Sequence, residues 1–239
     1  MPTAQQHYED LLAPIYVWMA GGLESALKAG TTDIASLVPG QGVAVDLGAG
    51  FGMHAIPLAE GGYEVVAIDT SKELLDVLRS HGSGRRIRAV EADLTDFRRY
   101  LDGPADLIVC LGDTLTHLPD AAQVTRLFQD VSASLRPGGQ LVLTFRDYSH
   151  PATGDARFIP VRSDAERIHT CFLEEAGDRM LVHDIVHERD GSAWRLRVSS
   201  YPKLRLSPEA IEAELRDAGL EPTFAVGPRG MLSVTARRR

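Results

Sequence analysis

A glycine-rich turn between two apolar runs is the feature that most constrains the fold. Residues 43–59 read VAVDLGAGFGMHAIPLA, and Gly48, Gly50 and Gly52 directly follow the strand-like run VAVDL. Such a turn lets the backbone come close to a ligand and points the N–H groups of the next helix at it. The turn therefore predicts the first strand and helix of an α/β unit that holds a nucleotide-like molecule.

Short apolar runs alternate with helical periodicity from residue 43 to residue 145. The apolar runs predict strands at 43–47, 63–69, 86–93, 106–112 and 139–145. The helical spacing of leucine, valine and phenylalanine predicts helices at 71–80 and 120–135, with Ser71 as an N-cap. Alternation of this kind is typical of βαβ units around a parallel sheet.

The pattern changes after residue 150. Strands of an antiparallel meander are predicted at 166–175, 179–189 and 193–206. A helix at 207–219 and strands at 222–227 and 231–236 are then expected to return to the sheet edge. We predict a doubly wound, mostly parallel seven-stranded α/β sheet of the Rossmann-like type, with the meander inserted after its fifth strand. The expected divisions are a helical cap at 1–40, the core at 41–159, a meander or lid at 160–206, and the end of the core at 207–239.

Charge and composition exclude several kinds of partner. A net charge of −8 disfavours a nucleic acid, because phosphate backbones are bound by clustered Lys and Arg. No apolar run reaches the roughly 18 residues of a membrane span, and the N-terminus lacks a basic region before its apolar part. We expect a cytoplasmic protein that binds no membrane, and homo-oligomerisation is left open. His183 and His187 lack the glutamate of an HExxH motif, so no metal site is expected.

Three nucleotide-like ligands compete for the glycine turn. A Walker loop requires a lysine after the glycines, and none follows. A nicotinamide dinucleotide site requires a small residue where Met53 stands. The third ligand is S-adenosylmethionine, whose sites use a glycine turn that carries an acid, here Asp46. Two further carboxylates, Asp69 and Asp93, end the next two strands. These two carboxylates are placed to accept hydrogen bonds from a ribose and an adenine.

These motifs resemble those of class I S-adenosylmethionine-dependent methyltransferases. Three later stretches resemble the glycine/sarcosine N-methyltransferase group: VCLGDTLTHLPD at 109–120, FRDYSHPATG at 145–154 and LRVSSYPKLRLSPEAIEAEL at 196–215. The resemblance covers most of residues 43–215 and implies a methyltransferase that uses S-adenosylmethionine and releases S-adenosylhomocysteine.

The resemblance also implies a set of cofactor-binding residues. Gly48 would approach the methionine part, Asp69 the ribose and Asp93 the adenine, while Tyr16 would close over the sulfonium. The group's arginine for the methionine carboxylate has no counterpart before Arg79, which leaves a backbone N–H or Lys28 for that task. The full expected set is Asp46, Gly48, Ala49, Gly50, Asp69, Thr70, Ala92, Asp93, Leu94, Leu111 and His117.

The expected acceptor is the nitrogen of a small amine or amino-acid-like molecule. By this resemblance, Arg146 aligns with an arginine that binds the substrate carboxylate in glycine methylation, and Asp113 stands where that group has asparagine. We predict an acceptor held between these two charges, with Tyr201 and Tyr16 as further contacts and with Asp113, His117, Arg146 and Tyr16 as catalytic residues. The alternatives are a hydroxyl acceptor with His117, Asp113 or His150 as base, a carboxylate acceptor, and a non-catalytic S-adenosylmethionine-binding protein.

Overall fold

A seven-stranded sheet lies at the centre of the protein in the computed structural model, which describes residues 3–150 and 152–239. Residues 1–2 of the expected cap and Pro151 of the 145–154 stretch lie outside the described residues. The strands are β1 (Val43–Leu47), β2 (Glu64–Asp69), β3 (Ile87–Glu91), β4 (Ala105–Cys110), β5 (Leu135–Phe145), β10 (Leu220–Val226) and β11 (Leu232–Arg238). Their order is β10-β11-β5-β4-β1-β2-β3, and β11 runs antiparallel to both of its neighbours, β10 and β5, while the remaining pairs are parallel. The predicted fold class is confirmed.

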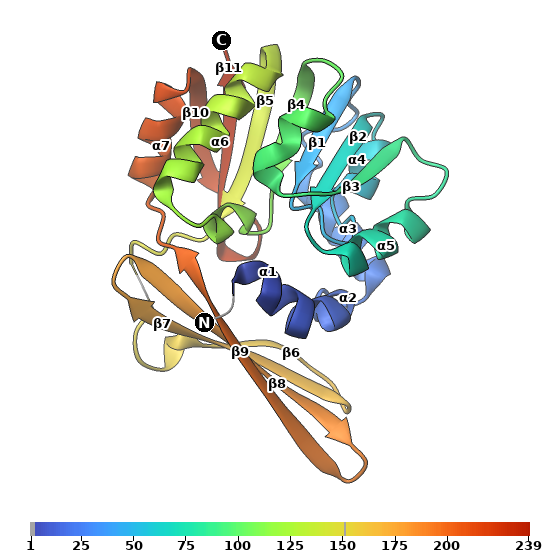
Figure 1. Ribbon diagram of the computed structural model, residues 1–239, viewed down its shortest axis with the longest axis vertical. Coiled ribbons are helices and arrows are strands. Elements are labelled where there is room, and N and C mark those ends of the chain that lie inside the picture. Colours follow the sequence, from blue (N-terminus) through green and yellow to red (C-terminus); the bar gives the residue numbers. More distant parts are fainter. Residues whose placement is uncertain (1–2, 151) are drawn as a thin grey trace.

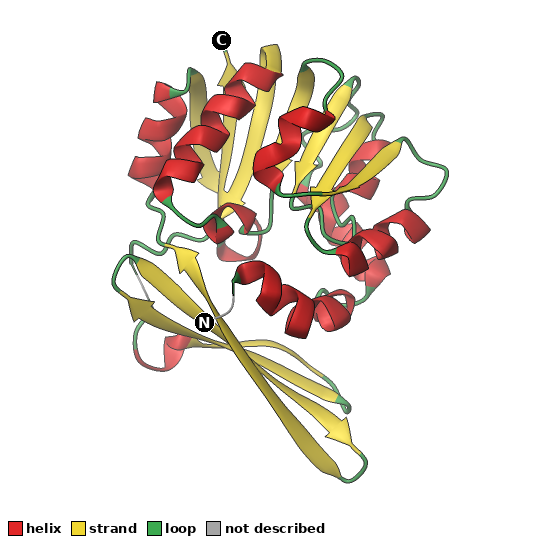
Figure 2. Ribbon diagram, viewed as in Figure 1, coloured by secondary structure: helices red, strands yellow, loops and turns green. Residues whose placement is uncertain are grey.

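Helices cover both faces of this sheet (Figures 1 and 2). One face carries α6 (Ala121–Ser134) and α7 (Pro208–Asp217), and the other carries α3 (Leu23–Asp33), α4 (Ala55–Glu60) and α5 (Lys72–His81). Because side chains alternate along a strand, β1 contributes Val45 and Leu47 to the first core and Ala44 to the second. The result is two buried apolar layers that hold the sheet rigidly.

Side-chain caps fix where three of these helices begin. The Ser71 hydroxyl accepts a hydrogen bond from Leu74 N at the start of α5, as the sequence predicted. The carboxylate of Asp120 accepts from Gln123 N at the start of α6, and Ser207 caps α7 with Pro208 in its first turn. The caps place the loops that precede these helices at defined positions along the carboxyl edge of the sheet.

A second sheet of four antiparallel strands extends away from the core (Figure 1). Its strands are β6 (Phe158–Ser163), β7 (Arg167–Ala176), β8 (Arg179–Asp190) and β9 (Ala193–Leu204). The sequence predicted β7, β8 and β9 but missed β6. That strand lies at the sheet edge, contains Pro160 and has an irregular register between Pro160 and Arg162, so it shows no apolar alternation.

The N-terminal helices lie between the two sheets (Figure 1). They comprise α1 (Ala4–His7), a π-helical turn at Tyr8–Leu12, a 3₁₀ turn at Ala13–Ile15 and α2 (Tyr16–Met19). Leu11, Leu12 and Ile15 pack with Val186 of β8 in one buried cluster. This packing encloses the space below the carboxyl ends of the parallel strands. No helix in the described part of the chain is long and apolar enough to span a membrane.

Candidate functional site

A cavity of about 560 Å³ lies between the carboxyl edge of the large sheet, the N-terminal helices and the inner face of the small sheet. Its volume falls in the range of small-molecule sites. Of the predicted site residues, Asp46 and the two alternatives Lys28 and His150 lie outside this wall. The wall contains Tyr16, Gly48, Ala49, Gly50, Asp69, Thr70, Ala92, Asp93, Leu94, Leu111, Asp113, His117, Arg146 and Tyr201.

The glycine turn forms one end of the cavity. Gly48 has a φ of 76°, and a Cβ there would lie 2.4 Å from the Thr114 side chain. Gly50 has a φ of 52°, and a Cβ there would meet no atom closer than Leu74 at 3.9 Å. Glycine is thus required at Gly48 by a neighbouring side chain, whereas at Gly50 it leaves the backbone open to a ligand.

Asp46 lies beneath this turn rather than in the cavity wall, unlike the direct cofactor contact that the sequence predicted. It is buried, and its Oδ2 has no hydrogen-bond partner among the described residues. Burial raises the pKa of Asp46 to about 6, and attraction to His54 offsets only part of that effect. The carboxylate accepts a hydrogen bond from the backbone N–H of Ala55, at the start of α4.

Asp69 and Asp93 lie at the ends of neighbouring strands, as predicted. Asp69 accepts hydrogen bonds from Gly50 N and Ser71 N, both at 2.8 Å, so it ties the turn to the end of β2. Asp93 accepts from the N–H and hydroxyl of Thr95 at 2.8 and 2.6 Å. Each carboxylate keeps further lone pairs for a ligand.

Arg229 is a cavity residue that the sequence analysis missed. Its guanidinium donates to Asp33 Oδ2 at 2.7 Å, and His54 Nε2 lies 3.2 Å from the same oxygen. The turn between β10 and β11 returns Arg229 to the wall that Met53 and His54 also form. Lys28, the cation that the sequence offered near this end, is exposed and is not part of the wall. No local pattern around Arg229 indicates this position.

Asp113 forms a buried ion pair with Lys203, a residue that the sequence analysis also missed. Asp113 Oδ2 lies 2.5 Å from Lys203 Nζ, and Oδ1 accepts the backbone N–H of Arg146 at 2.9 Å. Burial favours neutral Lys203, but the Asp113 carboxylate outweighs it and raises the pKa of Lys203 well above its usual value. The Arg146 guanidinium donates instead to the carbonyl of Arg229. Asp113 is therefore a neutralised anion rather than a free partner for a cationic acceptor.

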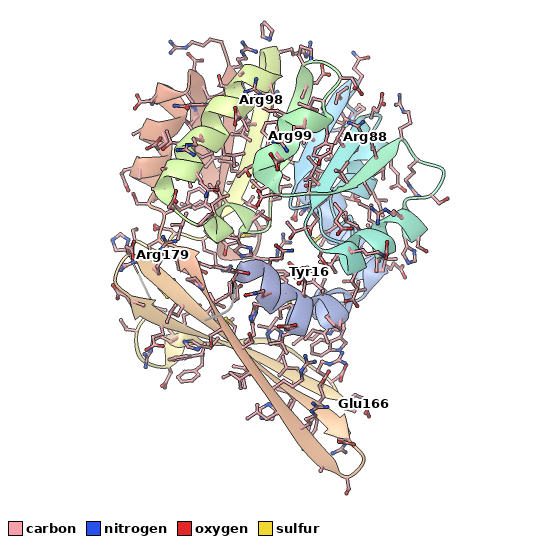
Figure 3. The ribbon with its side chains drawn as sticks, in the orientation of Figure 1. Tyr16, Arg88, Arg98, Arg99, Glu166 and Arg179 are labelled. Atoms are coloured by element: carbon pink, nitrogen blue, oxygen red, sulfur yellow. The ribbon has the colours of Figure 1, made fainter. Side chains whose placement is uncertain are left out.

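Four aromatic rings surround the centre of the cavity. The centroid of Tyr8 lies 5.7 Å from Tyr16, 5.5 Å from His117 and 6.2 Å from Tyr201. Figure 3 shows Tyr16 on the N-terminal helices, below the carboxyl edge of the large sheet. Burial raises the pKa of each tyrosine and lowers that of His117 well below its usual value, so all four rings are neutral near pH 7. His150, expected as an alternative base, has a 93% exposed side chain and lies outside the wall.

Comparison with known proteins shows the family of this chain. A family model described as a methyltransferase domain matches residues 44–139. The cypemycin N-terminal methyltransferase of a Streptomyces species is 30% identical over 199 residues, which cover 82% of this chain and 79% of that protein. The chain belongs to the class I S-adenosylmethionine-dependent methyltransferases. A glycine/sarcosine N-methyltransferase from Halorhodospira halochloris is 33% identical to this methyltransferase over 106 residues, 44% of this chain but only 40% of that protein.

Solved structures show that the methyltransferase fold extends along almost the whole chain. An S-adenosylmethionine-dependent methyltransferase from Clostridium acetobutylicum superposes with a TM-score of 0.76 at 17% identity, covering 97% of this methyltransferase and 98% of that chain. An amino pentose methyltransferase from Micromonospora echinaspora, solved with S-adenosylmethionine bound, gives 0.74 at 20% identity and covers 90% and 91%. The cofactor of this methyltransferase is S-adenosylmethionine, and its donor set fits: strand-end carboxylates suit a ribose diol, and the Arg229 guanidinium suits a carboxylate.

Proposed function

We propose that this methyltransferase methylates the nitrogen of a small amine or amino-acid-like molecule. The aromatic enclosure of Tyr8, Tyr16, His117 and Tyr201 carries the proposal, because aromatic faces attract the cationic groups that a sulfonium donor and an ammonium product both present. The names of its relatives, which describe methylation of glycine, sarcosine and the cypemycin N-terminus, support a nitrogen acceptor.

We propose the following placement of the cofactor. The backbone at Gly48 and Gly50 would border its methionine part, Asp69 would accept hydrogen bonds from the ribose hydroxyls, and Asp93 would accept one from the adenine amino group. Arg229, held by Asp33, would bind the methionine carboxylate in place of the missing N-terminal arginine. Thr70, Ala92, Leu94 and Leu111 would complete the contacts.

The chain's contribution to the reaction is alignment in an enclosed site. The bound cofactor supplies a methyl group already activated on a sulfonium. The aromatic rings exclude water, and holding two reactants in line in such a space can supply much of the rate enhancement. Because Asp113 is paired with Lys203, it orders the loop after β4 and fixes the backbone of Arg146.

Two measurements test this function. Calorimetric titration with S-adenosylmethionine should show binding, and a coupled assay should detect S-adenosylhomocysteine release with members of a panel of glycine, sarcosine, an amino sugar, a tripeptide with a free N-terminus, a phenol and a carboxylate. Release with the phenol or carboxylate alone would overturn nitrogen methylation. Cofactor binding without release from any of these compounds would instead favour a non-catalytic binding protein.

The enclosure itself is tested at Tyr8, which contacts both His117 and Tyr201. Tyr8→Phe keeps the ring and should retain most activity, whereas Tyr8→Leu removes it and should lower kcat by about 30-fold, which corresponds to the roughly 2 kcal/mol of a desolvated cation–π contact. Equal activity in the two variants would show that the ring makes no such contribution.

A further inference from the structure

The small sheet places a buried carboxylate of the cavity wall between two imidazoles, of which His169 also lines the cavity. Asp184 of β8 has Oδ1 at 2.6 Å from His169 Nε2 and Oδ2 at 2.8 Å from His7 Nε2. Burial opposes ionisation, but the hydrogen bonds from His169 and His7 outweigh it and hold the pKa of Asp184 at about 2. Because an ionised carboxylate only accepts, both imidazoles present Nε2–H to it.

The two imidazoles differ at their second nitrogen. His7 Nδ1 lies 2.7 Å from the Ser199 hydroxyl, which can donate to it. His169 is 2% exposed and lines the cavity, yet its Nδ1 has no hydrogen-bond partner within the described parts of the chain. Since Asp184 receives the Nε2 proton, Nδ1 of neutral His169 carries a lone pair. A buried acceptor without a donor is costly, which points to a ligand that supplies one.

His117 is the other cavity imidazole with an unpartnered nitrogen among the described residues, and its surroundings are different. Burial lowers the pKa of His117 well below its usual value, and the Lys203 ammonium lowers it further. None of the described carboxylates lies within hydrogen-bonding distance of its ring. A proton on His117 would add to the Lys203 charge, whereas a proton on His169 would be neutralised by Asp184.

We propose that His169 accepts the proton that the substrate amine loses before methyl transfer, and that Asp184 positions His169. The inference rests on the proposed nitrogen methylation and narrows the substrate class to amines that arrive as ammonium ions. An acceptor N–H bond breaks, its electron pair stays on nitrogen as the nucleophile, and the proton forms an Nδ1–H bond on His169. Asp184 balances the imidazolium charge, as a carboxylate does for a catalytic histidine in a hydrolase triad. The proton passes to water when the methylated product leaves.

A pH profile can report this proton because other groups that interact with Asp184 keep their charge near neutral pH. Burial raises the pKa values of Tyr8, Cys171 and Tyr201, and it lowers that of His117. Lys203 stays protonated beside Asp113. None of these five groups therefore changes its charge near neutral pH.

The first test uses the wild-type protein without any acceptor. Nitrogen-15 spectra of histidine-labelled enzyme should show His169 with a protonated Nε2 and an unprotonated Nδ1, the signals being assigned by their loss in His169→Gln. A proton on Nδ1 at neutral pH, with Nε2 unprotonated, would overturn the proposal, because the lone pair would then face Asp184.

The second test is the pH dependence of turnover with an amine from the panel. His169→Gln should lower kcat by about 100- to 10,000-fold near pH 7, the usual contribution of a positioned base, with little change in the KM for S-adenosylmethionine. The deficit should shrink as pH rises, because an amine that arrives neutral needs no base. Asp184→Asn should shift the acidic limb of the pH profile, that is, the fall in turnover at low pH. Substitution of a purely structural residue would not shift this limb.

His183 gives a matched control on the opposite face of the same sheet. Its nitrogens bond Glu174 and Ser200, both away from the cavity, so His183→Gln should keep the wild-type pH profile. An unchanged profile in His169→Gln, or loss of the acidic limb in His117→Gln alone, would overturn the proposal while leaving amine methylation intact. Failure of the wild type to release S-adenosylhomocysteine with any amine would overturn both.

Discussion

The carboxylate beneath the glycine turn should make the free protein less stable as pH rises. The pKa of Asp46 is raised from its ordinary value of 3.8 to about 6. The folded state therefore binds more protons than the unfolded chain between these values, so stability falls as pH increases through that window. The difference corresponds to about 3 kcal/mol above pH 6, at about 1.36 kcal/mol for each pKa unit. Asp46→Asn removes this cost while its amide oxygen can still accept from Ala55 N.

Urea unfolding of cofactor-free protein tests the sign and the size. The free energy of unfolding of Asp46→Asn should exceed that of the wild type by about 3 kcal/mol near pH 7.5 and by only about 1 kcal/mol near pH 4.5. Asp102→Asn, at a carboxylate with a 98% exposed side chain, should show no such pH dependence. A variant at Asp46 that is no more stable than the wild type near pH 7.5, or a difference that does not change with pH, would refute the reasoning.

Two further predictions concern Arg229 and Lys203, the two cationic residues of the cavity wall that the sequence analysis missed. Arg229→Met should weaken S-adenosylmethionine binding by about 10- to 100-fold in calorimetry, the value of a charged hydrogen bond. Lys28→Met, at an exposed lysine, should bind the cofactor normally. The reverse result would assign the methionine carboxylate of the cofactor to Lys28 in the N-terminal segment. Lys203→Met should lower the free energy of unfolding by about 3–5 kcal/mol because it leaves Asp113 buried and unpaired. The double variant with Asp113→Asn should recover most of that loss, and a double variant as unstable as the single one would argue against a buried ion pair.

The sequence predicted which residues gather at the glycine-turn end of the cavity because its signals there are local. The glycine turn, Asp69 and Asp93 each directly follow a strand, and parallel strands bring their carboxyl ends to one edge. Asp46 shares this motif but lies below the turn, since side chains alternate along β1 and that position points into the protein. Residue spacing alone cannot distinguish a carboxylate that supports the turn from one that contacts a ligand.

The sequence analysis missed Lys203, Asp184 and His169 at the other end of the cavity because these residues meet partners from distant parts of the chain. Lys203 reads as a solvated lysine near a strand end, yet β9 carries it to Asp113, ninety positions earlier in the chain. His7 and His169 meet only through Asp184, which requires the pairing of β7 with β8 and the docking of α1. A sequence motif contains residues that are close together along the chain, whereas these contacts join residues that are far apart in sequence.

The buried charges of the cavity explain why a positively charged donor can occupy an enclosed site. Asp113 is neutralised by Lys203 and Asp33 is held by Arg229, so neither is a free anion that would draw the sulfonium away from the acceptor. Among the described residues Asp184 has imidazole partners alone, so it would leave one negative charge at the end of the cavity where we propose that the acceptor binds. That charge favours an incoming ammonium ion and later a protonated His169. The same carboxylate would thus select the protonated amine and retain its proton during methyl transfer.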